Sequence, residues 1–483
     1  MSEQSIRFQK SVLLQERARE LIPGGCHTYA KGEDQYPVLA PGFIERGSGC
    51  HVWDVDGNRY IEFGMGNRAV GLGHAYPAVV RAVESVLGGG SNFTRPAKIE
   101  VECAETFLEL IDADMVKFCK DGSDATSGAV RLARAYTGRD LVACCADHPF
   151  FSTDDWFIGT TPMNSGIPEA VRKLTVTFRY NDIASVKELF DKHTGKLAAL
   201  ILEPSRGDDP RDGFLHEVQR LCRENGALLI LDEMITGFRW HTGGAQKLYG
   251  IKPDLTTFGK ALGNGFSVSA LAGQRKYMRL GGLEYTDRPR VFLLSTTHGA
   301  ETHALAAAIA TMRTYRDEPV ISHLHRQGEK LREGIGEAAR RHGVDGHFKV
   351  VGRPSCLAFA TLDRDGHPSQ AYRTLFLQET IRRGVLMPSL VVSYTHDDEA
   401  ISQTIEAVDG ALAVYAQALE SGTDRLLVGR PSQIVFRSYN RGDEQAGIIT
   451  RSPEYQMQPC DQNGLGTANA RPAPDRTLTS AID

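Results

Sequence analysis

Three sets of residues have types and spacing that could do chemistry, and the first is Lys260. It lies between a short apolar segment and a glycine-rich loop in DLTTFGKALGNGFSVSALAG. A lysine with a fixed position and a lowered pKa can attack a carbonyl carbon and form a Schiff base. Small flanking residues would let a flat cofactor approach the backbone. A lone lysine is more often a solvated surface charge, so this interpretation depends on the residues around it.

Two acidic residues end apolar segments. Asp232 closes ALLILDE and Glu203 closes LILEP. If these segments are buried strands, both acids lie at the carboxyl edge of a sheet, where open α/β sheets bind ligands. A buried carboxylate is costly without a partner. Asp232 is therefore either a paired or capping residue, or a group that keeps a pyridinium nitrogen protonated. Glu203 is either a turn residue or one that orients substrate or cofactor.

The third segment is GSDAT, in which Gly122 and Ser123 precede the helical pattern SGAVRLARAYTG. A glycine, a hydroxyl group and the free N–H groups of a helix start together form an anion site. An ordinary N-cap is the alternative interpretation.

The segments around these residues alternate between apolar runs and helical patterns. The clearest buried strands are predicted at 141–145, 198–204, 227–233 and 269–273, with helical stretches such as SVKELFDKH and FLHEVQRLCRENG between them. This alternation predicts a mainly parallel sheet that is covered on both faces. From about residue 316 the pattern is α+β, which predicts a second, smaller domain.

The two ends of the chain have their own patterns. An amphipathic helix is predicted before Pro23-Gly24-Gly25, and Asp56-Gly57 is typical of a two-residue hairpin turn. We expect residues 1–65 to contribute to the small domain, 66–315 to form the large domain and 316–420 to complete the small one. Residues 421–483 form a C-terminal extension. LLVGRPSQIVFRSYN is apolar enough to pack on the body, and the polar last part is expected to be disordered.

Composition excludes several classes of protein. Of the 483 residues, 41% are hydrophobic and 24% charged, with a net charge of -5, which is typical of a globular chain and not of a nucleic-acid binder. No apolar run is long enough to span a membrane. The charged N-terminus lacks a signal-peptide core, so we expect a cytoplasmic protein. His323 and His325 lack further ligands, so no metal site is expected.

Together these motifs resemble the class III PLP-dependent aminotransferases (PLP is pyridoxal 5'-phosphate), and among them most closely the glutamate-1-semialdehyde 2,1-aminomutases. LLILDEMITGFR, TTFGKALGNGFSVSALAGQ, RLARAYTGR, WDVDGNRYIEF and GLGHAYPAVVRAV carry the resemblance, which extends over roughly residues 10 to 420. It implies PLP as cofactor and PLP fold type I, with a large α/β domain, a mostly parallel sheet and a small α+β domain. It also implies a homodimer with the site at the interface.

The resemblance assigns a role to each residue described above. Lys260 would form the Schiff base with PLP and then move a proton on the substrate. Asp232 would pair with the pyridine nitrogen, and Gly122 and Ser123 would bind the phosphate. Glu203 would lie near the 3'-oxygen of the cofactor.

It also implies contacts that the sequence places less sharply. Met234 would pack against one face of the ring. In ADHPFFSTDDW either Phe150 or His148 would stack on the other face, with Phe150 favoured, unless both only pack locally. In STTHGAE, Thr296, or its neighbour Thr297, would reach the phosphate of the partner subunit.

Two departures concern the substrate. Lys31 stands about where the aminomutases carry a carboxylate-binding arginine, and His27 and Tyr29 add hydrogen-bonding groups nearby. MPSLVVSYTHDDEAI lacks the glutamate of the aminomutases. The acidic pair Glu33-Asp34 suits a polyhydroxylated or cationic substrate, unless it is only a solvated loop.

We therefore expect an aminotransferase that moves an amino group from an amino acid, L-glutamate first, to an aldehyde or ketone of sugar- or aminoglycoside-like type. The alternatives are a glutamate-1-semialdehyde-type 2,1-aminomutase and a β-amino acid aminotransferase. A non-catalytic homologue is the remaining hypothesis, and an intact Lys260 and Asp232 count against it.

Overall fold

The structure is a computed structural model that describes residues 8–440. At its centre lies a seven-stranded sheet with the strand order β4-β10-β9-β8-β7-β5-β6. Its strands are β4 (Met115–Cys119), β5 (Leu141–Cys145), β6 (Thr175–Phe178), β7 (Leu197–Leu202), β8 (Leu228–Asp232), β9 (Leu255–Phe258) and β10 (Ser269–Gly273). β10 is antiparallel to both neighbours, and the other adjacent pairs are parallel. The mostly parallel α/β sheet is confirmed, and the four predicted strands are β5, β7, β8 and β10.

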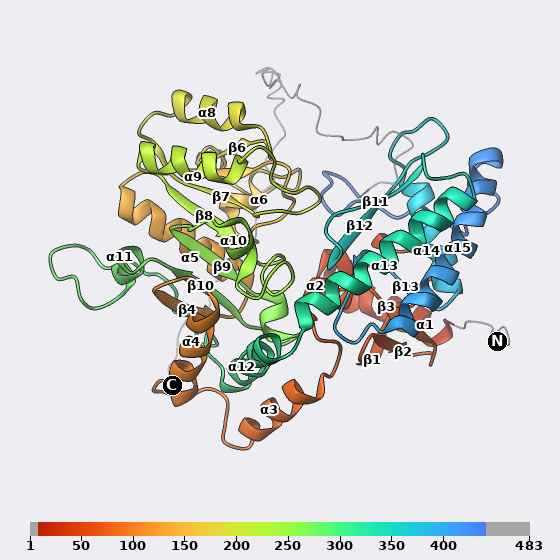
Figure 1. Ribbon diagram of the computed structural model, residues 1–483, viewed down its shortest axis with the longest axis horizontal. Helices are drawn as coiled ribbons and strands as arrows, with labels where there is room; N and C mark the ends of the chain where they lie inside the picture. Colours follow the sequence, from red (N-terminus) through yellow and green to blue (C-terminus); the bar gives the residue numbers. More distant parts are fainter. Residues whose placement is uncertain (1–7, 441–483) are drawn as a thin grey trace, which may run out of the picture. The chain divides into compact units, whose positions relative to one another are not determined.

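Helices cover this sheet, which explains why β7 is apolar throughout and β8 is apolar up to Asp232. Every residue of β7 and β8 is buried. α5 (Gly122–Thr137) packs against β7, β9 and β10, while α8 (Ile183–Lys192) contacts α9 (Phe214–Asn225), which packs on β8 (Figure 1). α12 (Thr302–Asp317) packs against α3 (Pro77–Leu87) and α4 (Lys98–Leu110). The shorter helices are α2 (Met65–Arg68), α6 (Asp155–Ile158), α7 (Glu169–Arg172), α10 (Gly244–Tyr249) and α11 (Arg275–Met278).

Segments from both ends of the chain share a second sheet. Helix α1 (Gln9–Leu21) is followed by β1 (Ile44–Ser48), β2 (His51–Asp54) and β3 (Arg59–Glu62), and β13 (Val385–Leu386) pairs in parallel with β3. The β2–β3 hairpin is confirmed, but its loop spans residues 55–58 and is not the predicted two-residue turn. The reason is Asp54, whose carboxylate accepts from the N–H groups of Asp56 at 3.1 Å and Asn58 at 2.8 Å and so stabilises the wider loop.

The chain after residue 316 is α+β, as predicted. β11 (Phe348–Val351), β12 (Cys356–Thr361) and β14 (Leu390–Val391) form an antiparallel sheet. α13 (Val320–Arg341) packs against α15 (Asp398–Ser421), and α15 packs against α14 (Gln370–Arg382). The division into domains at residues 65, 315 and 420 stays a prediction.

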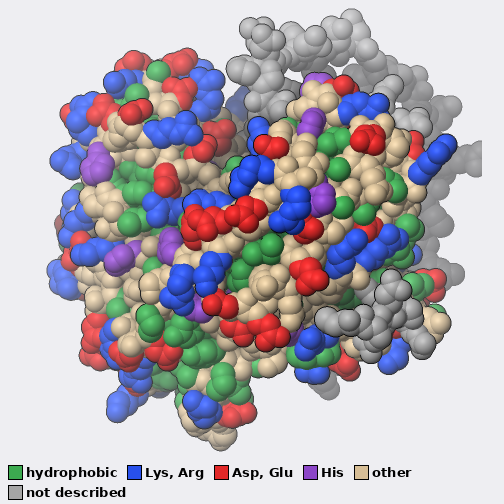
Figure 2. Space-filling model, turned by 45° about the vertical axis from the view of Figure 1, so that its right-hand side comes forward, with side chains coloured by type: hydrophobic (Ala, Val, Ile, Leu, Met, Phe, Trp, Pro, Cys, Tyr) green, Lys and Arg blue, Asp and Glu red, His purple; other side chains and the backbone are tan. Residues whose placement is uncertain are grey.

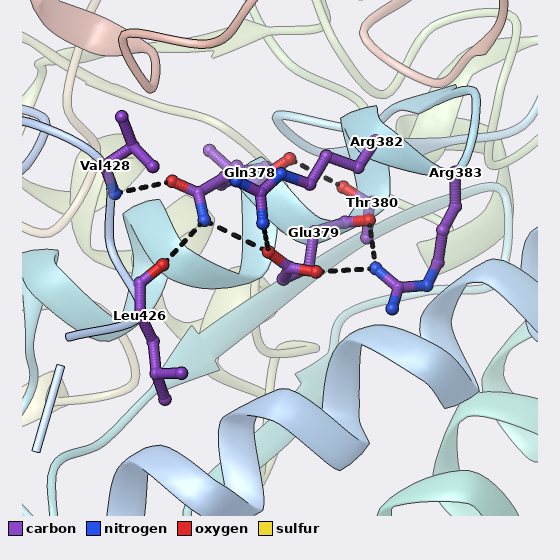
Figure 3. Close-up of polar contacts among 8 residues, drawn as sticks. Gln378, Glu379, Thr380, Arg382, Arg383, Leu426 and Val428 are labelled. Carbon is purple, nitrogen blue, oxygen red and sulfur yellow. Dashed lines mark hydrogen bonds and ion pairs between the residues drawn. The ribbon is translucent and has the colours of Figure 1, made fainter. Parts of the chain in front are cut away.

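Gln378 of α14 binds the segment after α15 through two backbone groups (Figure 3). Gln378 donates from Nε2 to the carbonyl oxygen of Leu426 at 3.0 Å and accepts from the N–H of Val428 at 2.8 Å. Beside it, the buried carboxylate of Glu379 accepts from Arg382 and Arg383, each at 2.7 Å. The prediction that this segment packs on the body is therefore confirmed. The expected disorder at the end of the chain lies outside the described residues.

The surface carries charges of both signs. On the face that Figure 2 presents, lysine and arginine side chains are interspersed with aspartate and glutamate. Among residues 8–440 no helix combines the length and the apolar character that crossing a membrane needs.

Candidate active site

Lys260 begins a short 3₁₀ turn (Lys260–Gly263) directly after β9, at the carboxyl edge of the central sheet. Its φ is 47°, an uncommon value for a residue with a side chain. The preceding Gly259 is there for space, because a Cβ at that position would lie 2.6 Å from the Met234 sulfur and even closer to the Ser269 hydroxyl. The glycine thus lets the backbone of Lys260 pass close to both side chains.

Asp232 is the last residue of β8, which is adjacent and parallel to β9. Its Oδ1 accepts from the Met234 N–H at 3.0 Å and from the Thr257 hydroxyl at 3.2 Å. Neither bond involves Oδ2. Burial, followed by the charge of Glu203, raises the pKa of Asp232 to about 7, and Lys260 opposes the rise.

Glu203 follows β7 and is buried beside Arg206. The Arg206 guanidinium donates from Nη1 to Glu203 Oε1 at 2.6 Å. Burial by itself would raise the pKa of Glu203, but Arg206, His148 and Lys260 hold it below its usual value. Among the described residues, Glu203 Oε2 is buried and has no hydrogen-bond partner.

These groups form one charged cluster around Lys260. Burial lowers the pKa of Lys260, while Asp232 and Glu203 raise it and Arg206 and Arg239 lower it further. Three strand ends that are far apart in the sequence therefore bring Lys260, Asp232 and Glu203 within electrostatic reach of one another. This arrangement can hold a lysine in its reactive neutral form and present a carboxylate to a cationic ring nitrogen.

Gly122 and Ser123 form the first turn of α5, next to this cluster. A Cβ at Gly122 would lie 3.0 Å from the Met234 sulfur, so this helix start and the lysine loop share Met234 as a neighbour. The N–H groups of Ser123 and Asp124 already donate to Asp121 Oδ1, at 2.8 and 3.1 Å. An anion that binds these N–H groups must displace the Asp121 carboxylate.

The two candidates for the ring-stacking residue differ in their surroundings. His148 is buried, and its Nδ1 accepts from the Glu203 N–H at 3.0 Å. Burial lowers the pKa of His148, which suits this acceptor role. Phe150 is 42% exposed and contacts Phe157 edge-on at 5.8 Å, so one side of its ring is available.

Thr296 and Thr297 lie in an exposed loop before α12. The Gly299 N–H donates to the Thr296 carbonyl oxygen at 3.3 Å. The Asn92 side chain donates to the Thr297 carbonyl oxygen at 3.0 Å. Within residues 8–440 these contacts do not join them to the Lys260 cluster. Their reach to a partner subunit stays a prediction.

The three predicted substrate residues differ in their surroundings. His27 and Lys31 line a cavity of about 700 Å³, together with Glu62, His74 and the loop that contains Asn67. Neither Lys260 nor Asp232 is among its lining residues. Tyr29 does not line this cavity and is 63% exposed.

Sequence reasoning missed three polar residues of the site. Arg206 is three residues after Glu203, and this opposite-charge spacing was a signal that could have found it. Arg239 is fully buried and donates to the carbonyl oxygens of Ile235, at 3.0 Å, and Arg68. Asn264 accepts from the Gly71 and Leu72 N–H groups at 3.0 and 2.8 Å and so ties the lysine loop to the segment between α2 and α3.

The residues present fit a pyridine cofactor with a phosphate group. Lys260 offers the amine, Asp232 Oδ2 is uncommitted by the bonds above, and Glu203 Oε2 is a buried oxygen without a partner. The start of α5 offers N–H groups once Asp121 turns away.

Comparison with known proteins agrees with this fit. The family model "Aminotransferase class-III" matches residues 28–408. Glutamate-1-semialdehyde 2,1-aminomutase of Acetivibrio thermocellus is 33% identical over 426 residues, which cover 83% of this chain and 97% of that protein.

Two solved structures are similar along most of their length. The FumI protein of Sphingopyxis sp. MTA144, in its PLP internal aldimine form, superposes with a TM-score of 0.79 at 29% identity, covering 86% of this chain and 98% of that one. An omega-transaminase from Sphaerobacter thermophilus gives a TM-score of 0.75 at 28% identity, covering 84% and 98%. Because the family model spans most of the chain and the site residues fit its cofactor, the protein belongs to the class III aminotransferases and is a PLP-dependent enzyme.

Proposed function

We propose that the protein transfers an amino group to and from a small substrate that carries a carboxylate, in an exchange between two molecules. The observation that carries the proposal is the meeting of Lys260, Asp232 and Glu203 at one edge of the sheet, with Arg206 beside them. The relatives named glutamate-1-semialdehyde 2,1-aminomutase, whose substrate carries a carboxylate, support a substrate of this kind.

Each residue of the cluster has a task in this proposal. PLP, when bound, supplies an electron sink that acidifies the C–H bond next to the amine. Lys260 holds the cofactor and then moves a proton with its amino group, whose pKa is lowered by burial. Asp232 pairs with the protonated ring nitrogen. Glu203 Oε2 accepts a hydrogen bond from the 3'-hydroxyl group of the cofactor. Gly122 and Ser123 bind the phosphate.

Residues that contact the two faces of the cofactor ring, and residues of a partner subunit, complete the proposed site. We propose that Met234 supports one face of the ring and that Phe150, with its exposed face, stacks on the other. His148 instead orients Glu203 through its backbone N–H. A homodimer would bring Thr296 or Thr297 of one subunit to the phosphate of the other. The exposed apolar residues Leu283 and Phe292, in the same stretch of chain, support such an interface.

A sugar- or aminoglycoside-like acceptor is less well supported. The acids that suggested it are engaged: Glu33 accepts from Arg19 at 2.9 Å, and Asp34 pairs with Arg437 at 2.6 Å. Each carboxylate would have to share or give up its arginine to bind a cationic sugar.

The second candidate is an aminomutase that keeps the amino group on one molecule, and the curated relatives favour it. The two candidates differ in the substrates they need. An aminotransferase needs an amino donor and a separate acceptor, whereas an aminomutase converts glutamate 1-semialdehyde as the sole substrate.

The experiment uses the PLP-loaded full chain. Separate additions of L-glutamate, 4-aminobutanoate and 3-aminobutanoate, without an acceptor, should convert the visible absorption of the lysine-bound cofactor to a near-ultraviolet band. Amine exchange with an added oxo acid should follow. Conversion of glutamate 1-semialdehyde alone, with no response to these amines, would instead establish the aminomutase. No spectral response to the three amines together with no conversion of glutamate 1-semialdehyde would refute both candidates.

A further inference from the structure

Arg206 is a cation near Lys260 that retains access to solvent. It lies in the loop after β7, and its side chain is 31% exposed, whereas that of its partner Glu203 is 3% exposed. Its charge acts on both Lys260 and His148. The guanidinium therefore stands between the buried cluster and the solvent side of the site.

The other guanidinium that acts on Lys260 is not available for a ligand. Arg239 is fully buried, and its two terminal nitrogens donate to the carbonyl oxygens of Ile235 and Arg68. Turning it toward a substrate would leave both carbonyls without these donors, and each would cost about 1–3 kcal/mol. Arg206, in contrast, uses Nη1 for its 2.6 Å bond to Glu203 and keeps further N–H donors.

The loop that carries Arg206 is fixed by Asp209, three residues further along the chain. Asp209 accepts from the Ser205 and Tyr249 hydroxyls at 3.0 and 2.8 Å. Arg353, between β11 and β12, donates to both of its carboxylate oxygens at 2.9 and 3.0 Å. These four bonds hold the backbone on either side of Arg206, so the guanidinium is presented at a set position.

We propose that Arg206 binds the carboxylate of the substrate and so determines the specificity of the enzyme for amino acids over uncharged amines. This inference rests on the proposed function. An arginine suits the task because its planar fork can pair with both oxygens of a carboxylate. Lys31, where the aminomutases carry an arginine, lines a cavity whose lining residues do not include Lys260, and Arg206 supplies the missing guanidinium from another element.

The test compares two substrates that differ only in charge, 3-aminobutanoate and its amide, 3-aminobutanamide. In the PLP-loaded Arg206→Ala variant, kcat/KM for the first half-reaction with the acid should fall about 100-fold, while that with the amide changes less than about threefold. Arg206→Lys should recover only part of the loss, since a lysine keeps the charge but not the fork. The matched control is Arg211→Ala, an exposed arginine of the same loop that pairs with Asp208 at 3.1 Å and should behave like wild type.

A binding measurement separates this inference from the proposed function. Butanoate and butanamide lack an amine, and their affinity for the holoenzyme is measured by calorimetry. Wild type should bind butanoate at least about 30-fold more tightly than Arg206→Ala does, with no such difference for butanamide. Equal losses for acid and amide, or equal butanoate binding by both proteins, would overturn the role of Arg206. If wild type binds butanoate in an Arg206-dependent manner but transfers no amine, the proposed function fails while the carboxylate site stands.

Discussion

Adding one methyl group at Gly259 tests the packing that positions the reactive lysine. In Gly259→Ala the new Cβ would lie 2.6 Å from the Met234 sulfur and closer still to the Ser269 hydroxyl. The φ of Gly259 is -178°, which any residue adopts, so the expected cost is one of space and not of backbone strain. Ser269 is buried in β10 and paired with Cys119, so it cannot move aside.

The magnitude follows from the nature of the contact. Overpacking a filled interior costs about 1–3 kcal/mol. The Met234 side chain is flexible and can absorb part of the overlap, so we expect the free energy of unfolding to fall by about 2 kcal/mol. Displacement of Lys260 by even about 1 Å should reduce turnover by about 100-fold.

The assay is urea unfolding of the holoenzyme together with single-turnover amine transfer. Gly88→Ala is the matched control, because nothing lies within 4 Å of a Cβ at that position. Adding Ser269→Ala to Gly259→Ala removes the closest overlap and should restore about half of the lost stability. If Gly259→Ala is as stable and as active as Gly88→Ala, the packing argument for this glycine is refuted.

Three further predictions concern charged residues of the site. Lys260→Ala should abolish amine transfer while the unfolding midpoint in urea stays within error of wild type; measurable turnover would remove Lys260 from the mechanism. In the PLP-free protein the pKa of Asp232 is raised from its usual 3.8 to about 7. The folded state therefore binds more protons than the unfolded state between these values, and this group makes stability fall as pH rises from about 4 to 7. Asp232→Asn should flatten that part of the stability–pH curve measured by urea unfolding, and an unchanged slope would contradict the burial argument. Asp121→Asn keeps a capping side chain at α5 but removes a charge that competes with phosphate, so PLP should bind about tenfold more tightly at low salt and the gain should shrink at high salt. Equal spectroscopic PLP affinities of variant and wild type would place the phosphate elsewhere.

The sequence predicted the sheet well because its strands are buried on both faces. β5 and β10 have the predicted bounds, and β7 and β8 begin or end within two residues of them. The hairpin loop after Asp54 was predicted less well, because a side chain that accepts from loop N–H groups can stabilise a longer turn than the glycine suggests.

The candidate site divides in the same way. Lys260, Asp232 and Glu203 could be recognised because each stands at the end of an apolar strand or beside a glycine-rich loop. The sequence could not distinguish the roles of their neighbours Arg206 and Arg239, because both are arginines a few residues after a strand-end acid. Only the structure shows that one is locked onto backbone carbonyls while the other keeps donors near solvent.

The sequence by itself determined the family, the buried apolar strands with the acids that end them, and the identity of the reactive lysine, because local patterns and motif spacing encode them. Tertiary structure decided which side chains share the site with Lys260, that Glu33 and Asp34 are paired with arginines, and that Asp121 occupies the start of α5. These properties depend on contacts between segments far apart in the chain, and burial at those contacts sets the charge that each group carries.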